Sequence, residues 1–98
     1  MRYELRYLPD AEMDLLVIDD YLSQFYPGTP GKFFRDYDKA VDSLLDMPAK
    51  YIIYPGTVDF HRLIVHDFLV FYKIDEDEHI VTIHRILHGS RDISDLLL

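Results

Sequence analysis

The chain has 98 residues, a formal net charge of −8 and no cysteine. This length predicts a single domain over residues 1–98. The negative charge argues against general nucleic-acid binding, which depends on neutralising many phosphates, and the absence of cysteine excludes disulfide bonds and thiolate chemistry. Uncharged apolar runs reach only about five residues, as in 68–72, which is too short for a signal peptide or a membrane helix. We therefore expect a soluble, cytoplasmic protein with no membrane partner.

The first half of the sequence predicts one strand and then two helices. Apolar and charged residues alternate over 2–7, which is the period of a half-buried strand. Residues 9–25 open with a proline and an acid, which favour a first helical turn, and their apolar residues recur at helical spacing. Residues 26–31 are rich in proline and glycine and predict a loop. A second apolar stripe of helical spacing runs over 33–45, and Pro48 ends this helix because the residue before a proline disfavours the helical conformation.

The second half predicts three strands, at about 60–65, 68–74 and 79–87, after an irregular segment at 49–59. Asp92 is a suitable N-cap for a short last helix. The order of strand, two helices and three strands predicts one α+β domain. In it, the last three strands form an antiparallel meander within an antiparallel sheet, and the helical hairpin packs on that sheet.

The middle and last of these strands carry apolar residues on both faces. In the middle strand, alternation separates Phe68, Val70, Tyr72 and Ile74 from Leu69 and Phe71. In the last strand, it separates Ile80 and Ile86 from Val81, Ile83 and Leu87. Two helices cover only one face of a sheet, and antiparallel sheets with a bare face normally alternate more cleanly. We expect the second face to be covered by the chain's tail, a second copy or a partner, and the tail alone looks too short.

Residues 79–91 stand out by their charge. They contain two arginines and three histidines but no acidic residue, although the whole chain has 18 acidic and 10 basic residues. The strand in this segment stops at His88 and Gly89, and Arg91 follows. Cations gathered at the end of a strand in an acidic protein indicate a site.

Short patterns of apolar and charged residues follow one another along nearly the whole chain. They are the opening strand, Ala11-x-x-Asp14-Leu15-x-x-Ile18-x-x-Tyr21-Leu22, the helix end from Leu44 to Pro48, Arg62-Leu63-Ile64-Val65, Phe68-Leu69-Val70-Phe71-Tyr72-Lys73-Ile74, and Val81-Thr82-Ile83-x-Arg85-Ile86-Leu87-His88-Gly89-x-Arg91-Asp92-Ile93. In this order and spacing they resemble the RelE/ParE superfamily, the toxins of type II toxin–antitoxin modules, also called plasmid stabilisation proteins. The resemblance implies the α+β fold described above, a cognate antitoxin as partner and no cofactor.

The resemblance implies two different activities. ParE-like members poison DNA gyrase, and RelE-like members cut mRNA in the ribosome without a metal. RelE-like ribonucleases are usually strongly basic and often have a tyrosine near the C-terminus, whereas this chain is acidic and has no tyrosine after Tyr72. The ParE-like function is therefore favoured, the ribonuclease is the alternative, and a non-toxic relative that only binds an antitoxin is a third hypothesis.

Four residues are candidates for toxicity: Arg62, Arg85, His88 and Arg91. The resemblance matches Arg62 and Arg85 to functional arginines of ribonuclease relatives. In a metal-free cleavage, histidine supplies acid–base chemistry and arginines stabilise the phosphorane charge, so these four would be catalytic only in a ribonuclease. A structural role competes with this interpretation, because Arg85 or Arg91 could pair with Asp92, with Asp95 or with a helix C-terminus.

No metal site is predicted. If His84 and His88 share a face of one strand, their spacing of about 13 Å is too large for one ion. For the antitoxin, we expect contact at the exposed sheet face or in the groove beside the helical hairpin. The net charge of −8 suggests that the contacting segment carries Lys or Arg. A homodimer and a hetero-oligomer with the antitoxin both stay open.

Overall fold

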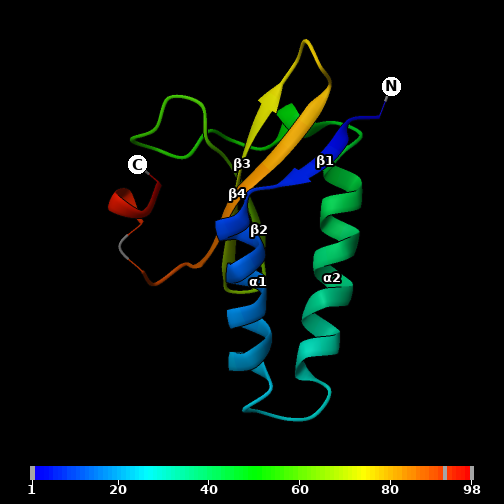
Figure 1. Cartoon of the computed structure of the whole chain (residues 1–98), viewed down its shortest axis with the longest axis vertical. Helices are drawn as coiled ribbons and strands as arrows, with labels where there is room; N and C mark the ends of the chain where they lie inside the picture. Colours follow the sequence, from blue (N-terminus) through cyan, green and yellow to red (C-terminus); the bar gives the residue numbers. More distant parts are fainter. Residues whose placement is uncertain (1, 92, 98) are drawn as a thin grey trace.

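The computed structural model describes residues 2–91 and 93–97, so the predicted N-cap Asp92 lies outside the described residues. The elements follow in the order β1 (Glu4–Tyr7), α1 (Pro9–Leu22), α2 (Thr29–Leu44), a 3₁₀ turn η1 (Pro48–Lys50), β2 (His61–Val65), β3 (Phe68–Asp75), β4 (Ile80–His88) and a 3₁₀ turn η2 (Ser94–Leu97). The two helices lie side by side as a hairpin (Figure 1). The α+β class and the order of the elements are confirmed.

The sheet is mixed, which corrects the expectation of an antiparallel sheet. Its strand order is β1-β4-β3-β2, and β2, β3 and β4 form the predicted antiparallel meander. Strand β1 instead runs parallel to β4, with Glu4 opposite Ile80 and Tyr7 opposite Ile83. The backbone N–H of Leu8 then donates to the Ile83 carbonyl (3.0 Å). Helix α1 therefore begins beside the second half of β4, and the rest of the chain serves as the long crossover that a parallel pair needs.

The helix boundaries differ from the predicted ones at the start of α2 and at the end of α1. Helix α2 begins at Thr29, inside the predicted loop, because Pro30 lies in the first turn, where its missing N–H is not needed. Helix α1 ends at Leu22 rather than Phe25. Helix α2 ends at Leu44, and Pro48 starts η1.

The main core lies between the helical hairpin and one face of the sheet. Its buried members come from both helices and from β2, β3 and β4; among them are Ala11, Ile18, Phe33, Tyr37, Val41, Leu44, Leu63, Val65, Phe68, Val70, Tyr72, Val81, Ile83 and Ile86. The Tyr7 and Tyr37 hydroxyls share a hydrogen bond (2.7 Å) at its border. The predicted alternation of β3 is confirmed, because Phe68, Val70, Tyr72 and Ile74 all belong to this side.

The chain itself covers the centre of the second face of the sheet, through its tail, which was one of the three expected covers, and through the segment before β2, which was not expected to do so. Phe71 and Leu87 on this face are almost fully buried. They belong to a second cluster with Tyr54 and Phe60 of the segment before β2, together with Ile93, Leu96 and Leu97 of the C-terminal end. The tail does not cover the face alone.

The segment before β2 reaches this position through backbone hydrogen bonds. The N–H of Tyr54 donates to the Phe60 carbonyl (2.7 Å), and the N–H of Arg62 donates to the Ile52 carbonyl (3.0 Å). The Tyr54 ring then meets Phe71 edge to face. This segment has no regular apolar period, so sequence patterning did not assign it a covering role.

A β-bulge interrupts the pairing of β3 with β4. Phe71 lies opposite Arg85, but Tyr72 lies opposite Ile83, so His84 is the extra residue on β4. A bulge re-aims the side chains that follow it. The two faces of β4 therefore exchange after Ile83.

The bulge corrects the predicted faces of the last strand. Ile86 packs with Val81 and Ile83 on the helix side, and Leu87 lies on the second face. Strict alternation predicted the reverse for both residues, because it assumes an unbroken ladder. The assumed shared face of His84 and His88 also fails: His84 meets Phe60 of the second cluster, whereas His88 meets Phe68 of the main core.

An ion pair links α1 to β4 where β1 has ended. Arg85 Nε donates to Asp14 Oδ2 (2.8 Å), and Arg85 Nη2 donates to Asp14 Oδ1 (3.0 Å). The backbone N–H of Ile86 donates to the same Oδ2 atom (2.9 Å). The two side chains are only 20% and 13% exposed. Asp14 therefore satisfies an N–H on the edge of β4 as well as the guanidinium. Sequence analysis had named Asp92, Asp95 or a helix C-terminus as possible partners of Arg85, whereas the structure shows Asp14 as its partner.

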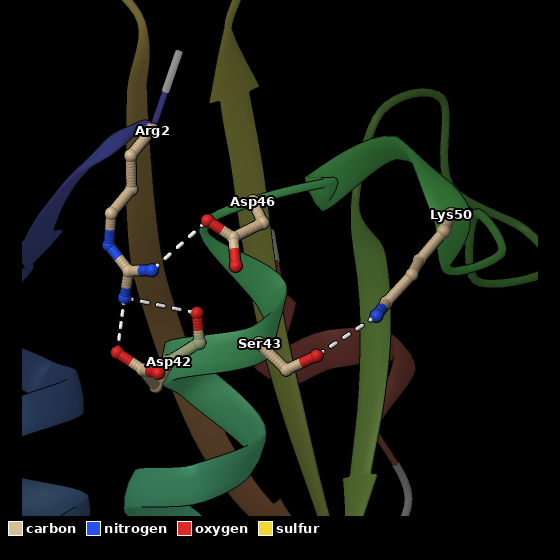
Figure 2. Close-up of polar contacts among 5 residues, drawn as sticks. All are labelled: Arg2, Asp42, Ser43, Asp46 and Lys50. Atoms are coloured by element: carbon tan, nitrogen blue, oxygen red, sulfur yellow. Dashed lines mark hydrogen bonds and ion pairs between the residues drawn. The ribbon is translucent and has the colours of Figure 1, made fainter.

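A second arginine makes a comparable set of contacts at the surface. Figure 2 shows Arg2 reaching the last turn of α2 and the segment after it. It pairs with Asp42 in the helix and with Asp46 beyond it (3.0 Å), and it also donates to the Asp42 carbonyl (3.1 Å). Its side chain is 45% exposed. Exposed ion pairs contribute little to stability, so this set is a natural reference for Asp14 and Arg85.

We expect Asp14→Ala to lower the free energy of unfolding by about 3 kcal/mol, since it leaves a half-buried guanidinium and the Ile86 N–H without their acceptor. Arg2→Ala should cost under about 1 kcal/mol, because its pairs are exposed. Urea unfolding followed by circular dichroism measures both. Equal losses for the two variants would show that burial does not distinguish the pairs.

His84 makes the second cluster sensitive to pH. Burial, followed by nearby Lys73, lowers the pKa of His84 below 6.5, while Asp59 acts in the opposite direction. The folded chain therefore favours neutral His84, and the unfolded chain takes up the proton first as the pH falls. We expect the stabilisation from His84 to be complete above about pH 6.5 and to be lost as the pH falls from there to the lowered pKa.

The variant His84→Gln isolates this effect, because glutamine does not titrate. The difference in urea midpoint between wild type and His84→Gln should shrink as the pH falls below about 6.5. A difference that stays constant from neutral to mildly acidic pH would contradict the assignment to His84.

Candidate functional site

The structure does not gather the four candidate residues into one cluster. Arg62 and Arg85 lie in a cross-strand row, with Phe71 between them. His88 ends β4 and Arg91 follows the turn after it, beside α1. Asp14 links the two pairs, because it binds Arg85 and also lines the hollow that contains His88 and Arg91.

Arg85 is held in one direction. The hydrogen bonds to Asp14 raise the pKa of Arg85 above its usual value, with smaller favourable effects from the charges of Asp14 and Asp10. Its charge is largely offset by the carboxylate beside it. Asp14 is thus a residue of the candidate site. Sequence analysis quoted it within a helix pattern but gave it no role. The signal that could have pointed to it is its position on the first helix, which the fold places beside β4.

Arg62 is unusual in its hydrogen bonding. Its Nε atom is buried and has no hydrogen-bond partner among the described residues. An unsatisfied buried donor costs about 1–3 kcal/mol. Such a cost at a residue on the second face, next to Phe71, is consistent with a role other than packing.

The turn after β4 is closed by its own contacts. His88 Nδ1 accepts hydrogen bonds from the Ser90 hydroxyl (2.7 Å) and the Ser90 N–H (3.1 Å). The N–H of Gly89 donates to the Asp67 carbonyl (2.9 Å), and that of Arg91 donates to the His88 carbonyl (3.1 Å). These amides are not available to an anion. Binding at this turn would depend on the exposed Arg91 side chain and on Nε2 of His88.

A groove runs along α1, and we call it the α1 groove. At one end, a hollow of about 330 Å³ is lined by Asp14, Val17, Ile18, Tyr21, His88 and Arg91, among others. At the other, a hollow of about 650 Å³ is lined by Tyr21, Phe25, Tyr26, Lys32, His66 and His88, among others. The shared residues Tyr21, Phe68 and His88 make the two hollows continuous.

The outer surface of α1 is apolar, which sequence analysis missed. It identified the buried stripe that contains Ala11 and Ile18, but a second set of apolar side chains is exposed: Met13, Leu16, Val17 and Tyr21, with Phe25 beyond the helix end. Exposed apolar patches on small proteins often mark contact sites. The signal was present, because α1 carries apolar residues at more positions than one buried face requires.

Two further properties bear on the chemistry. Within residues 2–91 and 93–97, no three His, Asp or Glu side chains are grouped as metal ligands. No helix in this described part is both long and apolar enough to span a membrane. The arrangement offers arginine donors on the sheet and an apolar groove with cations at its rim.

Comparison with solved structures shows where this fold occurs. A chromosomal ParDE toxin–antitoxin system from P. aeruginosa is similar with a TM-score of 0.72 and 20% identity, covering 89% of this chain and 96% of the other. An archaeal RelE–RelB complex from Pyrococcus horikoshii OT3 has a TM-score of 0.67 and 19% identity, and the match covers 93% of this chain and 99% of the other. A free-state RelE mutant from E. coli has a TM-score of 0.68 and 12% identity, and the match covers 98% of this chain and 93% of the other. At these identities the likeness concerns the fold.

The sequence itself gives the narrower assignment. A search of curated proteins finds no match. The family model described as the ParE toxin of the type II toxin–antitoxin system parDE matches residues 5–93, which include both helices and every strand from β2 to β4. The chain therefore belongs to the ParE toxin family, within the RelE/ParE superfamily of type II toxins.

Proposed function

We propose that this toxin arrests bacterial growth in the cytoplasm by inhibiting DNA gyrase, and that a cognate antitoxin neutralises it. The match of residues 5–93 to the ParE toxin family carries this proposal. The net charge of −8 supports it, because a protein target does not require the broad cationic surface that ribosomal RNA requires.

The RelE-like ribonuclease is the second candidate. The cross-strand row of Arg62 and Arg85 favours it, since two arginines on one face suit phosphorane stabilisation. Against it, Arg85 is already paired with Asp14, and no tyrosine follows Tyr72. A non-toxic relative that only binds the antitoxin is the third candidate.

We assign the toxic contact to Arg85, with Arg62, Arg91 and His88 in support. Arg85 combines a fixed direction with partial exposure, and Arg91 is an exposed cation beside the α1 groove. The pairing with Asp14 changes the choice of test, because Arg85→Ala would also disturb the fold. Arg85→Lys keeps the positive charge and is the better first variant.

We assign the antitoxin contact to the α1 groove rather than to the second sheet face, which the chain covers itself. An amphipathic partner segment would bury the exposed apolar side chains of α1. The exposed acids Asp19 and Asp20 on the same helix suit Lys or Arg at the edges of that segment. An antitoxin partner is also consistent with the toxin–antitoxin complexes among the similar structures.

We expect expression of the chain alone to arrest bacterial growth, and co-expression of the small protein encoded beside its gene to relieve the arrest. Purified chain should inhibit gyrase supercoiling and leave in vitro translation unaffected. Cut messages on ribosomes with intact supercoiling would instead identify the ribonuclease. Normal growth under strong, soluble expression would favour the non-toxic relative.

We expect Val17→Asp to weaken antitoxin binding by about 30-fold or more, since it places a charge in the centre of an apolar contact. Ile64→Asp is the matched control: Val17 and Ile64 are 60% and 54% exposed, but Ile64 lies on β2, away from the α1 groove. Titration calorimetry measures both. Equal weakening by the two variants would remove the groove as the docking site.

A further inference from the structure

The hydrogen bonds of Arg85 leave part of its guanidinium unused. A guanidinium has five N–H donors. One on Nε and one on Nη2 bind Asp14. Among the residues whose side chains the structure describes, Nη1 and Nη2 of Arg85 bind no acceptor other than Asp14. Arg85 thus presents a free donor edge whose direction is already fixed.

The charge around this edge does not suit a phosphate. Asp14 lies against the guanidinium, and Asp10 is close enough to act on it electrostatically. An incoming phosphate would therefore meet two carboxylates as well as one cation. A neutral carbonyl oxygen requires a well-directed donor but no excess positive charge, and this edge provides that.

The fixed guanidinium lies at a small hollow with a mixed lining. Arg85 lines a hollow of about 130 Å³, whose other walls come from the apolar side chains Leu8, Phe60, Leu96 and Leu97 and from the polar side chains Asp10 and His84. A precisely placed polar group is what fixes the orientation of a bound group in such a site.

We propose that Asp14 is a positioning residue, which holds Arg85 as a directional donor to a main-chain or side-chain carbonyl oxygen of a protein target. This inference rests on the proposed function and names the chemistry of its target contact. Asp14 acts through Arg85 and does not touch the target itself. Its Oδ2 atom binds both Arg85 Nε and the Ile86 N–H, so the guanidinium is fixed relative to the backbone of β4.

The bulge explains why Asp14 is needed. Arg85 directly follows the extra residue His84, and it lies beyond the last β4 residue that pairs with β1. No neighbouring strand limits its side chain on that edge. Without the carboxylate, the guanidinium would have many rotamers available, and its free edge would have no preferred direction.

The test compares gyrase inhibition by folded wild type, Asp14→Asn, Arg85→Lys and Arg85→Gln over a series of salt concentrations. Glu12→Gln is the matched control, because it removes an exposed acid from the same helix. Asparagine can still accept from the Ile86 N–H, so Asp14→Asn keeps the edge contact while weakening the hold on Arg85. Hydrogen exchange of β4 gives the folded fraction of each protein.

We expect Asp14→Asn and Arg85→Lys to lose about tenfold or more in potency per folded molecule, as for a lost hydrogen bond to a charged group. Glu12→Gln should match wild type. Arg85→Gln should lose potency without changing the salt dependence. A merely structural Asp14 would instead change potency only in proportion to the folded fraction.

Two results would overturn the inference while leaving the toxin function intact. One is full potency of well-folded Asp14→Asn. The other is a salt slope that falls by about one in Arg85→Gln, which is the sign of a phosphate contact. If folded wild type does not inhibit gyrase at all, the proposed function fails and the inference fails with it.

Discussion

The carboxylate of Asp14 holds together the part of the molecule where the sheet lacks a strand. Strand β1 pairs with β4 only as far as Ile83, so the rest of β4 has an open edge beside α1. The carboxylate of Asp14 accepts hydrogen bonds from the Ile86 N–H on that edge and from Nε and Nη2 of Arg85. Open edges invite unwanted pairing, and covering them with a helix is a common remedy. Here the same group that closes the edge also sets the direction of the arginine.

This arrangement connects the fold to the proposed toxicity. A bulge at His84 re-aims Arg85, the ion pair then fixes it, and the C-terminal residues complete the small hollow beside it. The α1 groove lies on the other side of Asp14 and carries His88 and Arg91. The proposed antitoxin contact and the proposed target contact therefore both involve Asp14.

Sequence patterns gave the parts of the structure that depend on local periodicity. The strand meander, the two helices and the alternation of β3 all follow from residue spacing. The parallel direction of β1 does not, because it depends on where α1 must begin. The bulge at His84 leaves no compositional mark, so the faces of Ile86 and Leu87 were assigned wrongly. Asp14 is far from Arg85 in sequence, and only the topology shows that the two side chains meet.

The most direct test of this account is a double-mutant cycle on Asp14 and Arg85. Each residue is changed to alanine alone and together, and the free energies of unfolding are measured in urea under identical conditions. A shared half-buried pair should give a coupling energy of about 2–3 kcal/mol, so that the double variant is far more stable than the sum of the single losses implies. Losses that add within about 0.5 kcal/mol would contradict the account, because Asp14 and Arg85 would then act independently.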